Sequence, residues 1–311
     1  VREDPHRKGL LYCGTETGMY CSMDNGQSWQ GLQFNLPVTP IHDIAVHARE
    51  KDLVVATHGR SFWILDDLTP LHQLADSIRR APLSLLTPRP TYLIGNGSYV
   101  SKTMSEGTNA PSGVQLTYWL RDSVRGELTL EIVDQKDSVI RRFSNLKTDT
   151  GDDRKPNTET FESVPERRSG SVLPTRTGMN RFTWDMNLKG VSKVNDAVYW
   201  FGGPGGISVP PGRYRAVLRS GNESAGTSFV IVKDPRLETT DGDFEQQYDL
   251  GSRIVEKAER VNTTINAIAE LSRQVTAWEA RARDAADSAT AAKVKVLAAS
   301  INDSLSRIEK A

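Results

Sequence analysis

The chain has 311 residues, with 39 basic and 39 acidic side chains, and 37% of its residues are hydrophobic. This length predicts about two domains with a buried core. The balanced charge argues against a nucleic-acid partner, which would favour a basic excess. No run approaches the roughly 18 apolar residues of a membrane span, and two cysteines exclude a disulfide-stapled fold and a four-cysteine zinc site. The start at Val-Arg-Glu-Asp, without a Met or a leader, favours a fragment or a processed chain.

Residues 1–75 contain an internal repeat. Residues 11–15 align with residues 53–57, and the same offset carries Tyr20 onto Phe62 and Cys21 onto Trp63. Each copy predicts a strand, a tight turn and a second strand, with the turns at residues 16–18 and 58–60. A period of about 40 to 50 residues with paired strands is typical of β-propeller blades.

Between the two copies, residues 22–29 read Ser-Met-Asp-Asn-Gly-Gln-Ser-Trp. This segment matches the Asp-box, Ser/Thr-x-Asp-x-Gly-x-Thr/Ser-Trp, of the BNR repeats in sialidase-like and sortilin-type propellers. In such a turn the carboxylate accepts backbone N–H groups, the glycine adopts a positive φ and the tryptophan packs between blades. The motif indicates architecture and not chemistry. Its structural positions here are Ser22, Asp24, Gly26, Ser28 and Trp29.

Residues 55–71 resemble the last blade of a bacterial family of BNR-repeat, sortilin N-terminal-like proteins, often labelled glycosyl hydrolases. The resemblance extends over nearly the whole chain. It implies an exported protein, in the periplasm, at the cell surface or outside the cell. Residues 1–75 hold fewer than two blades, whereas a propeller closes with about four or more. We therefore expect these incomplete blades to pair with missing propeller blades or with another protein chain.

Residues 88–236 predict an immunoglobulin-like (Ig-like) β-sandwich. Trp184 and Tyr214 are its expected core anchors, and residues 178–185 and 209–214 resemble the Ig-like module of flagellar hook-capping proteins. Residues 147–176 are polar and predict a mobile insert. The strand candidates are residues 114–120, 127–133, 139–143, 181–185, 212–219 and 226–232.

Residues 240–311 contain one glycine and no proline, and they predict a long antiparallel helical hairpin. Thr240 and Asp243 have the spacing of a capping box at its start. Apolar residues recur with heptad-like steps from Ile254 to Ile268, and Trp278 is expected in the hairpin core. The predicted fold class is thus mainly β plus α, with terminal propeller blades, an Ig-like sandwich and a C-terminal helical hairpin.

Two polar groups are candidates for chemistry. Asp66 and Asp67 form a carboxylate pair, but on a strand they would point to opposite faces and would not flank one glycosidic bond. A role at a turn or blade edge is therefore favoured. The turn His58, Gly59 and Arg60 is the most distinctive polar cluster, with a structural role favoured over contact with an anion or a sugar.

The remaining candidates predict no cofactor and no metal site. His42 and His47 are five residues apart, which fits one strand face poorly, and no His or Cys pair has a metal-ligand spacing. Cys13 and Cys21 flank the first hairpin, where two free thiols are favoured over a cross-strand disulfide.

The sequence leaves several functional hypotheses open. The favoured one is a non-catalytic scaffold or binding region of an exported BNR-propeller protein that engages a protein or a glycan. The alternative is part of a glycoside hydrolase whose catalytic carboxylates lie mainly in missing N-terminal blades. A third is a helical arm for oligomerisation. No catalytic residue is assigned, and no membrane span or nucleic-acid partner is expected.

Overall fold

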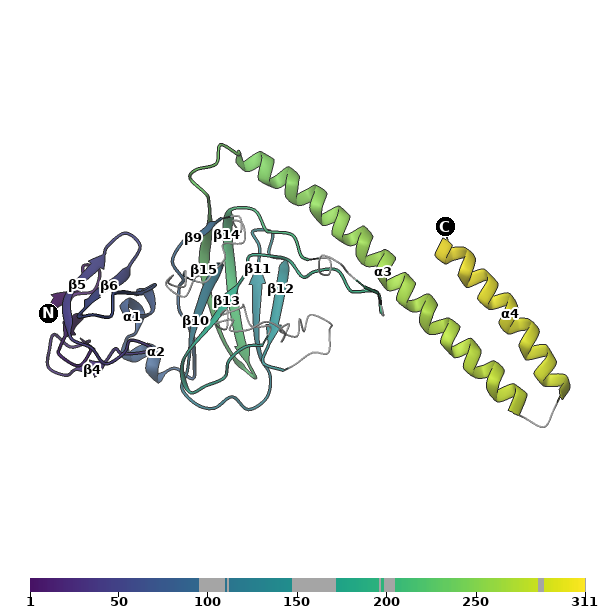
Figure 1. The fold of residues 1–311 in the computed structure, drawn as a ribbon, viewed down its shortest axis with the longest axis horizontal. Coiled ribbons are helices and arrows are strands. Elements are labelled where there is room, and N and C mark those ends of the chain that lie inside the picture. The colour runs from purple at the N-terminus through teal and green to yellow at the C-terminus, as the bar shows by residue number, and fades with distance from the viewer. Residues whose placement is uncertain are drawn as a thin grey trace. The chain divides into compact units, whose positions relative to one another are not determined.

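The computed structural model describes residues 1–94, 110, 112–146, 172–195, 197–198, 205–284 and 288–310. The fold is mixed β and α, with several sheets and a C-terminal helical hairpin, as predicted at this level (Figure 1). The chain divides into two compact units. The first contains residues 1–149, 155–186 and 211–238, and the second contains residues 150–154, 187–210 and 239–311.

The first unit begins with two antiparallel sheets whose strands are paired in chain order. The four-stranded sheet contains β1 (Arg2–Glu3), β2 (Leu11–Gly14), β3 (Met19–Ser22) and β4 (Gln30–Gly31). The three-stranded sheet contains β5 (Ile41–His47), β6 (Asp52–Thr57) and β7 (Phe62–Leu65), and the short helices α1 (Thr69–Gln73) and α2 (Asp76–Arg80) follow. The two sheets share one apolar core, which includes Leu10, Tyr12, Met19, Ile44, Leu53, Val55 and Leu68.

Both copies of the sequence repeat fold as β-hairpins. Leu11 pairs with Ser22 in the first hairpin and Leu53 pairs with Leu65 in the second, so the second turn is one residue longer. The one-residue difference in turn length goes with a change of inward face on the first strands, because Tyr12 is buried and Leu11 half-buried, whereas the aligned Val54 is half-buried and Leu53 is buried.

The register of the first hairpin also decides the state of the cysteines. Cys13 lies opposite Tyr20, and Cys21 lies opposite Tyr12, so the two thiols point to opposite faces of the sheet. Both are free, and burial raises the pKa of the Cys21 thiol. A turn centred on Thr17 would have placed the cysteines opposite each other, but the hairpin is centred half a residue earlier.

The rest of the first unit forms two further sheets. Their orders are β13-β10-β8 and β12-β11-β14-β15-β9, all antiparallel except the β15–β9 pair. The strands are β8 (Leu83–Leu85), β9 (Thr91–Leu93), β10 (Val114–Leu120), β11 (Leu128–Val133), β12 (Val139–Ser144), β13 (Gly178–Trp184), β14 (Gly212–Ser220) and β15 (Glu223–Lys233).

Aromatic side chains pack between these two sheets. The fully buried Trp184 ring lies edge-on to Tyr214 and Phe229, with centroids 6.0 and 6.2 Å away, and Phe143 packs on Phe182 at 4.6 Å. Trp184 and Tyr214 are thus core residues, as predicted. All six predicted strands form, whereas β8 and β9 were not predicted. Of the predicted insert at 147–176, residues 147–171 lie outside the described residues.

The second unit contains α3 (Asp241–Asp284) and α4 (Ser288–Lys310). The capping box is confirmed, because the Thr240 N–H donates to Asp243 Oδ2 (2.8 Å) and the Asp243 N–H donates to Thr240 Oγ1 (3.2 Å). The apolar periodicity only partly reports burial. Ile268, Ala298 and Leu305 are buried, but Trp278 is 63% exposed with the Arg281 guanidinium over its ring, so its predicted place in the core is wrong. No helix within the described ranges combines the length and apolarity needed to cross a membrane.

Candidate functional site

The Asp-box joins β3 to β4, and one carboxylate organises it. Asp24 Oδ1 accepts hydrogen bonds from the Ser22 hydroxyl (2.7 Å) and the Ser28 N–H (2.8 Å), while Ser22 Oγ accepts the Gly26 N–H (2.8 Å). Gly26 has a φ of +88°, which glycine adopts without steric cost. Hydrogen bonds from Ser28 and then Ser22 lower the pKa of Asp24 to about 2. The box therefore acts as a turn held by an ionised carboxylate.

Trp29, the last residue of the Asp-box, lies at the surface. It is 39% exposed, and its ring lies 3.8 Å from the position that a Cβ would take at Gly26. Its packing is therefore local to the turn in the described chain. Nothing in this geometry gives the Asp-box a chemical role.

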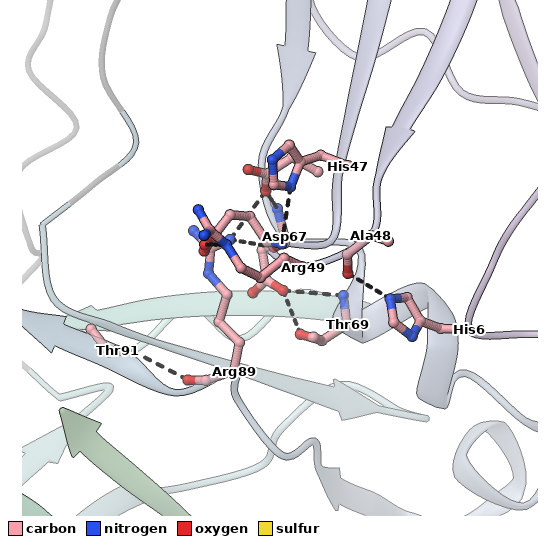
Figure 2. A network of polar contacts seen from close by, with 10 residues as sticks. His6, His47, Ala48, Arg49, Asp67, Thr69, Arg89 and Thr91 are labelled. Carbon is pink, nitrogen blue, oxygen red and sulfur yellow. Dashed lines mark hydrogen bonds and ion pairs between the residues drawn. The ribbon is translucent and has the colours of Figure 1, made fainter.

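The carboxylate pair lies just after β7 and not on a strand. Asp67 is buried, and its Oδ1 accepts the Thr69 N–H (3.1 Å) and the Thr69 hydroxyl (Figure 2). The Asp67 N–H donates to Asp52 Oδ1 (2.9 Å) at the start of β6. Asp67 thus connects β7 to α1 and to the neighbouring strand, which is a structural role.

Asp66 has the more unusual electrostatic environment. Burial raises the pKa of its carboxyl, and the nearby Asp52 carboxylate raises it further, while Arg89 and Arg181 partly offset both effects. A carboxyl with a raised pKa next to another carboxylate is a feature of acid–base sites. However, Asp52 Oδ1 also accepts a hydrogen bond from Arg89 Nη1 (3.1 Å), in addition to the one from the Asp67 N–H. The Asp52 carboxylate therefore already accepts two hydrogen bonds that fix the start of β6.

Arg89 lies at the centre of the polar network in Figure 2. Its Nη1 donates to the Glu50 carbonyl oxygen (2.7 Å) as well as to Asp52, and its own carbonyl oxygen accepts the Thr91 hydroxyl (3.3 Å). The network therefore ties the turn between β5 and β6 to the segment that leads into β9. The Arg89 guanidinium thus stabilises the tertiary structure.

The turn His58, Gly59 and Arg60 is exposed, yet its backbone is fixed. The His58 N–H donates to the Pro40 carbonyl oxygen (2.9 Å), and the His58 carbonyl oxygen accepts the hydroxyl of the buried Thr39 (3.1 Å). Gly59 has a φ of +73°, which this turn needs and which glycine supplies. The backbone of the turn is thus anchored on one side to the segment that precedes β5.

The far side of the same turn carries a charge and an aromatic ring. The Arg60 side chain is exposed, and its carbonyl oxygen accepts the Trp63 indole N–H (2.9 Å). Phe62 is 76% exposed, although a phenyl ring is usually buried. The turn therefore presents a guanidinium and a phenyl ring to solvent on a hydrogen-bonded backbone.

His42 also lies at this turn, a position that the sequence pattern does not predict. Its Nε2 lies 3.1 Å from His58 Nδ1, with the ring centroids 5.0 Å apart. The cause is a β-bulge: Ile41 pairs with Thr57 and Asp43 with Ala56, so His42 is the extra residue. Bulges re-aim side chains and are common beside functional sites. A period-two pattern assumes regular pairing and does not locate a bulge.

The described residues contain no group of three or more His, Cys, Asp or Glu side chains arranged to hold a metal ion. Comparison of the chain with protein-family models, with curated proteins and with solved structures found no match. The functional argument therefore depends on the residues and their geometry.

Proposed function

We propose that the chain is a non-catalytic binding region of an exported BNR-type propeller protein, and that the turn at residues 58–62 contacts a protein or a glycan. The observation that carries this proposal is the exposure of Arg60 and Phe62 on a turn whose backbone is fixed by Thr39 and Pro40. Exposed aromatic and arginine side chains on a preorganised support are typical binding hot spots.

The architecture proposed here follows the same resemblance. Two small antiparallel sheets in chain order, one with an Asp-box between its third and fourth strands, support the assignment of residues 1–75 to propeller blades. Two packed sheets with a buried tryptophan between them support an Ig-like sandwich at residues 88–236. In this proposal the blades pair with further blades or with another chain.

The test measures binding of the full chain to an array of neutral and acidic oligosaccharides. We expect Arg60→Ala and Phe62→Ala each to weaken the strongest interaction about tenfold, which corresponds to about 1.4 kcal/mol. Arg49→Ala is the matched control, because Arg49 is also an exposed arginine at a turn of the same sheet. Equal binding by all three variants and the parent chain would contradict the assignment of this turn.

A glycoside hydrolase is the second candidate, and Asp66 is the observation that favours it. A raised pKa suits a general acid in such enzymes. The hydrogen bonds of Asp67 and Asp52 weigh against a hydrolase. Both carboxylates are used in structural contacts, so neither is available as the second catalytic carboxylate beside Asp66. Release of reducing ends from the same oligosaccharides, lost on Asp66→Asn, would establish this candidate and overturn the first.

A further inference from the structure

The described residues place two exposed imidazoles within hydrogen-bond distance. His42 Nε2 and His58 Nδ1 are 3.1 Å apart, and the ring planes differ by 18°. Apart from this contact with each other, neither ring is hydrogen-bonded to a side chain within the described part of the chain. The proposed glycan or protein contact does not use this pair, since it depends on Arg60 and Phe62.

The backbone of both histidines is held in place. The bulge between Ile41 and Asp43 directs His42 out of the regular pairing of β5 with β6. His58 is fixed by its two backbone hydrogen bonds to Pro40 and Thr39. The local fold therefore places the two side chains next to each other from fixed backbone positions.

We propose that His42 and His58 bind one divalent transition-metal ion of the Zn²⁺, Ni²⁺ or Cu²⁺ class. Imidazole nitrogens bind these ions at about 2.0–2.1 Å, so two nitrogens of a tetrahedral site lie about 3.3 Å apart. The observed separation of 3.1 Å needs only a small adjustment. In the metal-free pair, one ring donates its N–H to the other; when the ion binds, solvent takes that proton and the ring's other nitrogen is protonated instead, so both facing nitrogens offer lone pairs to the metal.

The ligand set defines the kind of site. Two imidazoles supply two donors, and the described residues bring no third His, Cys, Asp or Glu to a common centre. Water completes the coordination, so the site is open. The donors are nitrogen only, which disfavours Ca²⁺ and Mg²⁺, because those ions prefer oxygen ligands. The expected order of affinity is Cu²⁺ above Ni²⁺ and Zn²⁺.

The experiment is a calorimetric titration of the metal-free full chain with ZnCl₂, NiCl₂ and CuCl₂ at pH 7.5. We expect one site per chain, and we expect His42→Ala and His58→Ala each to weaken it at least about tenfold, since loss of an outer-shell partner alone costs that much. Binding should weaken at pH 5.5, because only neutral imidazole ligates a metal.

His47→Ala is the matched control. His47 is another exposed histidine on β5, and its Nδ1 accepts the Glu50 N–H (3.2 Å) instead of facing a second ring. We expect this variant to bind like the parent chain. Zinc-induced changes in the imidazole ¹⁵N shifts should be confined to His42 and His58. Equal affinity of the parent, His42→Ala and His58→Ala chains, or shifts at other histidines, would overturn the proposal.

Discussion

Asp4 is a buried carboxylate with all of its contacts inside the protein. It accepts the Tyr12 hydroxyl (2.7 Å), the His72 Nε2–H (2.9 Å) and the N–H groups of His6 (2.8 Å) and Arg7 (3.0 Å). Burial raises the pKa of Asp4, but the hydrogen bonds from Tyr12, His72 and His6 outweigh it, and the net pKa is lowered. The N-terminal segment is thereby joined to α1, 68 residues later.

This geometry predicts the pH dependence of the fold. A lowered folded-state pKa gives stability that is present above the unfolded pKa of about 3.9 and is lost as the pH falls through the folded pKa. We expect Asp4→Asn to cost about 2 kcal/mol at pH 7, and the difference from the parent chain to narrow below pH 4. Urea unfolding at pH 7 and pH 3 measures this. A difference that does not change with pH would contradict the role of the ionised carboxylate.

At the scale of an element, α3 uses one polar face to hold a separate segment of its own unit. The Asn262 Nδ2–H donates to the Ser192 carbonyl oxygen (2.7 Å), and the Asn266 Nδ2–H donates to the Lys193 carbonyl oxygen (2.8 Å). Asn266 Oδ1 also accepts the Asn195 N–H (2.8 Å). Residues four apart share a helix face, so these two amides act along one line.

We expect Asn266→Ala to loosen residues 192–195 without unfolding α3. The variant loses two hydrogen bonds of about 1 kcal/mol each, which corresponds to roughly 30-fold faster amide exchange there. Thr263→Ala is the control, because among the described residues the Thr263 hydroxyl donates only to backbone carbonyl oxygens of its own helix. Hydrogen exchange followed at residues 192–195 decides the matter, and equal rates in both variants would show that the contact does not restrain the segment.

Elements also show how far the sequence predicts this fold. Alternation and turn residues located both hairpins, six strands and the two long helices, because those signals are local. Burial along α3, in contrast, depends on contacts with another helix, which the local sequence does not reveal. At about 1.5 Å per residue, α3 spans about 66 Å and α4 about 35 Å, so α4 can cover only part of α3. Trp278 lies near the end of α3 that adjoins α4, but it is off the less exposed line through Ile268, Val275 and Glu279, so the direction of its side chain leaves it exposed.

The candidate site was predictable only in part, for the same physical reason. The turn at residues 58–60 is visible in the sequence because glycine marks it. His42 is not, since its position depends on a one-residue bulge in the pairing of β5 with β6. The separation of Cys13 from Cys21 likewise depends on register, which reverses the face of every side chain when it shifts by one residue.

For the whole molecule, the division into two units predicts two separable unfolding events. Trp184 belongs to the first unit, is fully buried and contacts both Tyr214 and Phe229 across the two sheets. Truncation of this side chain to alanine would leave a cavity between the two sheets. We therefore expect Trp184→Ala to destabilise the first unit by about 3–5 kcal/mol, and Trp184→Phe to cost less.

The second unit should unfold independently of the first, because its helices have a core of their own around Ile268, Ala298 and Leu305. Near-ultraviolet circular dichroism reports the first unit, and the helical signal at a wavelength of about 222 nm reports α3 and α4, which supply most of the helix. In Trp184→Ala the near-ultraviolet transition should move to a lower urea concentration, while the transition of the helical signal should not move.

Trp278→Ala is the matched control. This variant removes an exposed tryptophan of α3 and should change the free energy of unfolding by less than about 1 kcal/mol. If both transitions moved together in Trp184→Ala, the two units would unfold as one cooperative body, which would contradict their independence.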